Sequence, residues 1–436
     1  MANQKRDLLD DLIDIQSDWQ ALSNPFGDIA DSLAADPSQR KVFNPADYKE
    51  KPFANSNRCL CTASGRDDVC TRCLDVCPVN AIEIHKQSVI IGDDCRKCGL
   101  CAAACPTETI STRRHMPRQV YDKIARAASA YEHCYVTCTR ALKRLPKDNE
   151  IILGCVGAIS RDLWFSLMAD YDNISVYLPV GICDRCKTTT GEEFYCDAIS
   201  TAEEWAQASL GLVADESEMT HELTREYKRS QFMSSAVHSA ERLLTRTNPA
   251  LAGAKAVANK ISAHASRLDQ LQRTLEGAVG AKTSNNRQRM LTQNRKLVMG
   301  ALQHDEGLAK FIDLTAPVCD ASKCTMCGDC AKVCTTRALD LDVNGHITIQ
   351  ASYCVSCGAC VKVCEDGALA MEPMDVTELI VPDPAAEELA RKKAQAKAEA
   401  QKYIEQGKKQ LSRAADVLEG LGTSDSGAND SKTSKK

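Results

Sequence analysis

Two pairs of short segments alternate apolar and polar residues, which is the period of a half-buried β-strand. One pair covers residues 81–84 and 88–91, and the other covers residues 338–341 and 346–349. Asn344-Gly345 lies between the members of the second pair and is typical of a tight hairpin turn, because both residues tolerate positive φ. The pattern therefore predicts one β-hairpin toward each end of the chain.

Three apolar runs between these hairpins predict a different kind of sheet. They cover residues 133–138, 150–155 and 174–180, and a helical period fits residues 160–170. Because the helix lies between the second and third runs, the order favours parallel pairing in at least part of this sheet.

Helical periodicity dominates the rest of the chain. Residues 1–50 form an acidic arm with one short amphipathic helix, which packs on its own protein or docks a partner subunit. Residues 214–310 are expected to form a helical spacer, with long helices near 218–246 and 250–279. A C-terminal helix should occupy residues 377–421, ahead of a disordered tail at 422–436.

Two local patterns refine the helical region. Ser200-x-x-Glu203 has the form of a capping box and predicts the start of a helix that contains Trp205 and Leu212. A basic cluster follows, which we expect on a solvated face or against an acidic redox partner. Its members are Arg287, Arg289, Arg295 and Lys296.

Composition limits the class of protein. The chain has 436 residues, 24 Cys and a formal net charge of −5, which gives no support for binding nucleic acid. No apolar run approaches the roughly 18 residues of a membrane span, and the Asp-rich start does not fit a signal peptide. We therefore expect a cytoplasmic protein whose thiols bind metal and do not form disulfides.

The cysteines occur in a repeated spacing. Residues 324–364 contain Cys324-x2-Cys327-x2-Cys330-x3-Cys334 and then Cys354-x2-Cys357-x2-Cys360-x3-Cys364. A cubane [4Fe–4S] cluster needs four thiolates around one small volume, and a loop with Cys at every third position supplies three of them. The alternatives are a zinc ribbon or buried free thiols, but zinc sites usually show two separated pairs of ligands.

A related arrangement occurs at residues 55–116. Its later run, Cys95-x2-Cys98-x2-Cys101-x3-Cys105, is regular, whereas the earlier run, Cys70-x2-Cys73-x3-Cys77, has no Cys three residues before its first member. We expect the missing ligand to be Cys61, with Cys59 as the alternate, because a longer loop costs little closure entropy.

Both segments resemble the bacterial-type dicluster ferredoxins, and the later segment departs from that family by having Thr335 and Glu365 where Pro is usual. The resemblance implies a ferredoxin fold in which each run lends its fourth Cys to the cluster of the other run. The implied ligand sets are Cys61, Cys70, Cys73 and Cys105; Cys77, Cys95, Cys98 and Cys101; Cys324, Cys327, Cys330 and Cys364; and Cys334, Cys354, Cys357 and Cys360.

The central apolar runs end at further cysteines. Because the carboxyl ends of parallel strands meet at one edge of a sheet, four thiols should gather there. They are Cys138, Cys155, Cys183 and Cys186. We interpret them as a fifth metal centre, with [4Fe–4S] ahead of zinc, a redox-active Cys183/Cys186 dithiol or buried thiols. Cys134 is an alternate to Cys138, and Cys196 and Cys319 are expected to be buried thiols.

The fold class that follows is α+β. Two dicluster ferredoxin-like domains (51–116 and 311–376) flank a small α/β domain (117–213) and the helical spacer. No Gly-rich dinucleotide fingerprint and no P-loop occurs, and Gly154-x-x-Gly157 is too short for either.

The favoured function is electron transfer through four [4Fe–4S] clusters and a fifth centre. By resemblance, the chain is a subunit of an anaerobic redox complex, with redox proteins or a catalytic subunit as partners and no transmembrane segment. The alternative is an oxidoreductase, in which the central cluster or the Cys183/Cys186 dithiol acts on a disulfide or sulfur substrate. A third interpretation is a redox sensor with an oxygen-labile cluster.

Overall fold

The computed structural model describes residues 42–228, 249–381, 391–392 and 395. The chain divides into two compact units, Met1–Val381 and Pro382–Lys436. Residues 391, 392 and 395 of the second unit are helical. The predicted N-terminal helix, the disordered tail and most of the C-terminal helix lie outside the described residues.

The first cysteine unit, which we define as residues 51–116, is closed by its two ends. Strand β1 (Phe53–Ala54) pairs antiparallel with β4 (Ile110–Ser111). The predicted hairpin between the cysteine runs is confirmed, because β2 (Ile82–His85) pairs antiparallel with β3 (Ser88–Ile91). Short helices complete the unit: η2 (Pro45–Tyr48) before it, η3 (Ser56–Arg58), α3 (Leu60–Ser64), α4 (Arg72–Asp75) and α5 (Leu100–Ala104).

The second cysteine unit, residues 311–376, repeats this plan. Its ends pair as β9 (Thr315–Cys319) and β12 (Leu369–Pro373). The second predicted hairpin is also confirmed, as β10 (Leu339–Leu341) pairs with β11 (Ile347–Ile349), and Gly345 in the turn has a φ of 84°. Its helices are α12 (Asp329–Val333), η7 (Ala351–Tyr353) and α13 (Ala359–Lys362), and η8 (Val376–Leu379) follows.

The central region contains a four-stranded parallel sheet in the order β6-β5-β7-β8. The predicted strands are found as β5 (Cys134–Cys138), β6 (Glu150–Leu153) and β7 (Ile174–Tyr177), and the predicted helix is α7 (Arg161–Asp170). Every residue of β5 is buried, as expected for a strand with neighbours on both sides. The other elements are α6 (Pro117–Ala130), η4 (Val156–Ala158), α8 (Gly191–Ala206), β8 (Gly211–Val213) and η5 (Glu216–Glu218).

The expected capping box is wrong. Ser200 lies inside α8, which begins at Gly191 and runs through Trp205 to Ala206. Glu203 instead accepts a hydrogen bond from the backbone N–H of Leu210 at 2.7 Å, after the helix has ended. Leu212, expected in the helix, belongs to strand β8, so tertiary pairing of the chain overrode a local motif.

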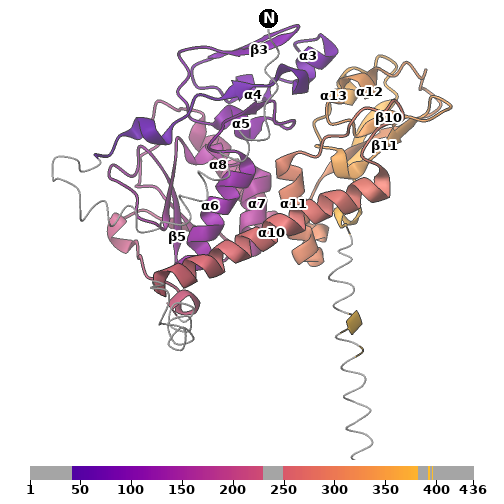
Figure 1. Ribbon diagram of the computed structural model, residues 1–436. Helices are drawn as coiled ribbons and strands as arrows, with labels where there is room; N and C mark the ends of the chain where they lie inside the picture. The colour runs from indigo at the N-terminus through magenta and orange to yellow at the C-terminus, as the bar shows by residue number, and fades with distance from the viewer. Residues whose placement is uncertain (1–41, 229–248, 382–390, 393–394, 396–436) are drawn as a thin grey trace, which may run out of the picture. The chain divides into compact units, whose positions relative to one another are not determined.

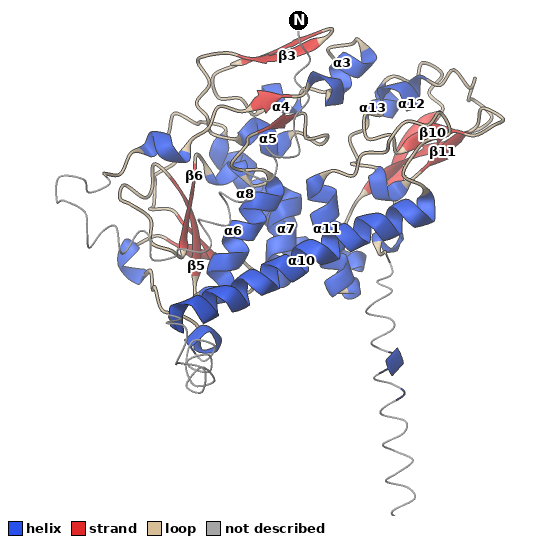
Figure 2. Cartoon of the chain, in the orientation of Figure 1, coloured by secondary structure: helices blue, strands red, loops and turns tan. Residues whose placement is uncertain are grey.

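The helical spacer is confirmed only in part. Helix α10 (Pro249–Val279) matches the second predicted helix, while residues 229–246 of the first lie outside the described residues. Residues 219–224 and 280–292 are not helical, and α11 (Gln293–His304) and η6 (Glu306–Phe311) complete the region. Helix α10 contacts both α6 and α11, and it passes beneath them in Figure 1. Figure 2 shows helices between the central sheet and the second cysteine unit.

Candidate metal centres

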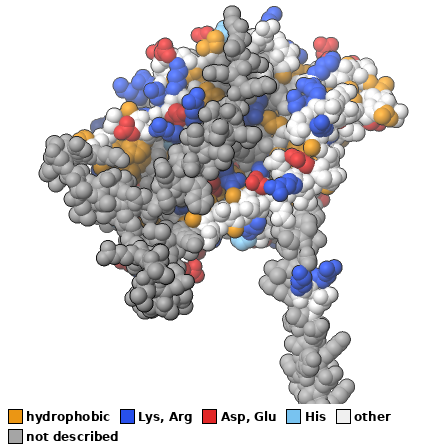
Figure 3. Space-filling view, in the orientation of Figure 1, with side chains coloured by type: hydrophobic (Ala, Val, Ile, Leu, Met, Phe, Trp, Pro, Cys, Tyr) orange, Lys and Arg blue, Asp and Glu red, His pale blue; other side chains and the backbone are white. Residues whose placement is uncertain are grey.

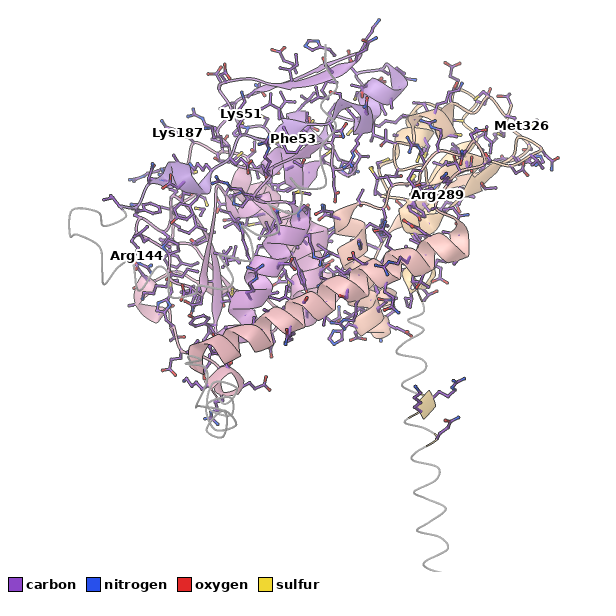
Figure 4. The ribbon with its side chains drawn as sticks, viewed as in Figure 1. Lys51, Phe53, Arg144, Lys187, Arg289 and Met326 are labelled. Carbon is purple, nitrogen blue, oxygen red and sulfur yellow. The ribbon has the colours of Figure 1, made fainter. Side chains whose placement is uncertain are left out.

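Three of the four cysteine runs share a backbone conformation. The residue two after the first Cys and the residue directly after the second Cys both have positive φ, a conformation that L-residues seldom adopt. The positions are Lys97 and Gly99, Met326 and Gly328, and Ser356 and Gly358. These turns curve the backbone of each loop. The side chains of closely spaced cysteines can then point into the same small volume. Met326 lies on an exposed loop, labelled in Figure 4.

A second repeated turn follows the last Cys of every run. The third residue after that Cys has positive φ and donates its backbone N–H to the carbonyl of the Cys. These residues are Asn80, Glu108, Arg337 and Gly367. In three runs the next residue donates its N–H to the cysteine sulfur, from Ala81 to Cys77 at 3.3 Å, Thr109 to Cys105 at 3.2 Å and Ala368 to Cys364 at 3.3 Å.

Such N–H···S contacts fit iron–sulfur ligation, because a hydrogen bond to the charged form of a group favours that form. Within the described residues, no group of three or more His, Cys, Asp and Glu side chains is arranged around a single metal ion. The ligands of a cubane each bind a different iron at its corners, so they need not converge on one point.

The structure brings together cysteines from different runs. Burial raises the pKa of Cys73 to about 12, and the nearby Cys105 adds to the shift. In the same way, burial raises the pKa of Cys357 to about 12, with a further contribution from Cys334. Cys77 contributes likewise to the raised pKa of Cys98, after burial and the charge of Cys95. In these three cases the fourth Cys of one run thus lies near a Cys of its partner run, as the ferredoxin resemblance implies.

We name four groups accordingly. Set 1 is Cys59, Cys70, Cys73 and Cys105; set 2 is Cys77, Cys95, Cys98 and Cys101; set 3 is Cys324, Cys327, Cys330 and Cys364; set 4 is Cys334, Cys354, Cys357 and Cys360. In set 3, Cys324 and Cys364 both contribute to the raised pKa of Cys319. Cys324 and Cys364 therefore lie near the same residue.

Set 1 contains Cys59 in place of the expected Cys61. Cys59, Cys70, Cys73 and Cys105 line one small cavity of 20 Å³, and Cys61 is not among its lining residues. The thiol of Cys61 is directed instead to the backbone carbonyls of Cys70, at 3.1 Å, and Asp67. The geometry thus favours the alternate residue.

The central set, Cys138, Cys155, Cys183 and Cys186, lines a cavity of 310 Å³ at the carboxyl edge of the parallel sheet. This is where strand polarity predicted the four residues. Burial raises the pKa of Cys155 to about 12, and Cys138 and Cys186 are near enough to contribute. Cys183 lies 3.5 Å from the hydroxyl of Tyr195.

The central cavity has a cationic lining. Lys49, Arg96, Arg140 and Lys187 line it together with a single acidic residue, Glu192. Helix α8 begins at Gly191, which also lines the cavity, so the positive end of the helix dipole adds to this potential. Figure 3 shows Lys and Arg side chains gathered at the upper left of its face, where Figure 4 labels Lys187.

Three other cysteines differ from expectation. Cys134 cannot replace Cys138, because it lies at the opposite end of β5, where its thiol faces the carbonyl of Ile124. Cys196 is exposed on α8 and is not a buried thiol. Cys319 is only partly buried and adjoins set 3.

Glycines bring set 2 close to the central set. A Cβ on Gly154 would lie 2.5 Å from the carbonyl oxygen of Lys97 and 3.4 Å from the Cα of Cys98. A Cβ on Gly157 would lie 2.4 Å from the side chain of Leu100. Gly154-x-x-Gly157, which matched no nucleotide motif, is therefore a packing surface for the cysteine loop of set 2.

The two cysteine units also share a hydrophobic core. Buried residues of α3, such as Leu60, belong to the same cluster as Val333 of α12 and Ala359 of α13. Lys362 reaches from the second unit to the carbonyl of Asp68 in the first, at 3.4 Å. Arg72, between two ligands of set 1, is also near enough to Cys357 of set 4 to affect its pKa.

Comparisons with known proteins find the same kind of domain at both cysteine units. The 4Fe-4S dicluster domain matches the chain twice, at residues 68–109 and 323–368. The chain is 35% identical over 46 residues to a ferredoxin of Methanothermococcus thermolithotrophicus, covering 10% of this chain and 77% of that protein. An uncharacterized ferredoxin of Methanocaldococcus jannaschii is 37% identical over 43 residues, covering 9% of this chain and 69% of that protein. No solved structure matches the chain.

Proposed function

The chain belongs to the 4Fe-4S dicluster ferredoxin family, an iron–sulfur electron-transfer family, and we propose that it conducts electrons through five [4Fe–4S] centres. Each cluster, when bound, accepts or donates one electron at a time. Sets 1 to 4 hold four of the centres and the central set holds the fifth. One observation carries the proposal: the last Cys of one run lies near a Cys of the other run in the same unit. Cys105 lies near Cys73, and Cys334 lies near Cys357.

The contacts between these sets support a continuous path. The central set adjoins set 2 through Gly154, and set 2 shares the first cysteine unit with set 1. Arg72 and Lys362 connect the surroundings of set 1 with those of set 4, and set 3 shares the second unit with set 4. The proposed order is therefore central set, set 2, set 1, set 4 and set 3.

We assign the chain to an anaerobic redox complex as an electron-transfer subunit. We propose the same domain limits that the sequence predicts. In this arrangement the two cysteine units and the helical spacer keep the proposed clusters at fixed positions along the electron path. A reducing cytoplasm suits its 24 Cys. Among the described residues, none of the helices is both long and apolar enough for a membrane span.

Metal analysis after strictly anoxic purification tests the proposal. We expect about twenty iron atoms per chain, whereas about sixteen would remove the fifth centre. Electron paramagnetic resonance (EPR) of the reduced protein should give signals of interacting [4Fe–4S] clusters. Zinc without iron would refute the whole proposal. Proteins that co-purify should include a redox partner or a catalytic subunit.

A second candidate function rests on the basic residues around the central set. The four basic side chains that line this site would attract an anionic disulfide to the centre held there. Reducing one disulfide to two thiols consumes two electrons, delivered through the iron–sulfur path, and two protons. The test is anoxic reduction of oxidised glutathione by dithionite-reduced protein, after removal of excess dithionite. If the wild-type protein reduces the disulfide and the variants Lys187→Glu and Arg140→Glu do so more slowly, the enzymatic function is supported. If the wild-type protein shows no turnover, this function is excluded for oxidised glutathione.

A further inference from the structure

Arg295 is a buried cation that forms no salt bridge with any carboxylate among the described residues. Its side chain belongs to α11, and the residue is only 3% exposed. Its Nη2 donates to the carbonyl of Cys354 at 2.6 Å, and its Nε has no hydrogen-bond partner among the described residues. The acid near enough to influence it, Asp162, pairs with Arg161 at 3.4 Å.

Two other residues of the same basic cluster do have carboxylate partners. Arg289, also buried and labelled in Figure 4, lies 3.4 Å from the carboxylate of Asp340. Lys296 pairs with Asp269 at 2.8 Å. The expectation of a solvated basic face is therefore wrong for Arg289 and Arg295, which are 8% and 3% exposed.

Burying a guanidinium costs several kcal/mol unless an anion compensates its charge, and Asp162 is shared with Arg161. Among the described residues, the thiol near enough to interact with Arg295 is that of Cys354, a member of set 4. Four thiolates around a [4Fe–4S] core carry a net negative charge, and this charge grows when an electron is added. Arg295 therefore stabilises the reduced form more than the oxidised form.

We propose that Arg295 raises the reduction potential of the centre at set 4 and makes it the point where electrons collect between the two cysteine units. The inference rests on the proposed iron–sulfur function. Arg72 reinforces it from the other side, because its charge acts on Cys357 while its own helix carries Cys73 of set 1. Arg295 is a positioning residue, because it acts through Cys354.

The test is an anoxic redox titration of the full-length, cluster-loaded protein, followed by EPR. A Cys357→Ser variant identifies the signal of set 4. In Arg295→Gln, the ratio of reduced to oxidised centre at a fixed potential should fall about tenfold, which corresponds to about 59 mV. The other centres should keep their midpoints. Arg295→Lys, which retains the charge, should keep most of the potential.

Lys296→Gln is the matched control, since it removes a positive charge from the same helix at a residue paired with Asp269. It should leave set 4 unchanged. If Arg295→Gln fails to fold, Arg72→Gln is titrated in its place, because Arg72 is exposed. Its substitution should lower the midpoint potential of the set 4 centre by a smaller amount. An unchanged midpoint in the variant that folds overturns the inference. Absence of iron from the wild-type protein would instead overturn the proposed function.

Discussion

Replacing Gly154 by Ala should push the loop of set 2 away from the central set. The new Cβ would be 2.5 Å from the backbone oxygen of Lys97, which is closer than Cβ atoms approach such a neighbour. Neither Gly154 nor the oxygen lies on a flexible side chain, so backbone must move by roughly 0.5–1 Å. Overpacking of this kind typically costs about 1–3 kcal/mol. Gly154 is not among the residues with positive φ, so the substitution adds no conformational strain of that type.

Gly277→Ala provides a matched control of opposite sign. Gly277 lies within α10, and a Cβ there meets nothing within 4 Å. Because Ala favours the helix, this variant should gain about 0.5–1 kcal/mol. Anoxic urea unfolding, followed by circular dichroism and by the visible absorbance of the clusters, compares the two variants with the wild type. A Gly154→Ala protein as stable as the wild type, with unchanged EPR coupling between set 2 and the central centre, would refute the proposed close approach.

Three further predictions concern other residues. Cys59→Ser should lower the iron content by about four atoms per chain, while Cys61→Ser should retain it; equal loss in both would contradict the assignment to Cys59. Burial lowers the pKa of His264 from 6.5 to about 4, so the folded state keeps a neutral ring where the unfolded chain is protonated. Stability should therefore fall by about 2–3 kcal/mol as the pH drops from 6.5 to 4, and His264→Phe should flatten this dependence in pH-resolved urea unfolding. Arg289→Met should cost about 2 kcal/mol, because it removes the cation beside Asp340 while the hydrogen bonds from Ser284 to Asp340 remain; urea unfolding measures this loss, and a stability equal to that of the wild type would contradict it.

The cysteine sets and hairpins were accessible from sequence because their signals are local. The spacing of Cys354, Cys357 and Cys360 and the turn at Asn344-Gly345 both specify conformation within a few residues. The central set also followed from sequence, since strand polarity determines which ends of a parallel sheet meet. Each of these features depends on a single helix, strand or loop, or on the order of neighbouring elements along the chain.

What sequence could not resolve depends on contacts across the fold. Cys59 and Cys61 have equally plausible spacing, and only the direction of the Cys61 thiol toward the carbonyl of Cys70 separates them. Ser200 fits a capping box wherever the helix begins, but α8 already starts at Gly191 beside the central cavity. Arg295 belongs to a basic cluster that the sequence alone places on a solvated face, although in the fold it is buried and donates a hydrogen bond to the carbonyl of Cys354.

The shared core of the two cysteine units bears on how electrons could pass between them. Two ferredoxin-like units on a free linker would meet only by diffusion, and their relative position would change with each encounter. Here Leu60 of the first unit and Val333 of the second belong to one buried cluster. Separating them would expose apolar surface at about 25 cal/mol per Å², so the arrangement resists opening. If sets 1 and 4 hold clusters as we propose, this shared core keeps their spacing fixed, and the charge of Arg72 acts between them.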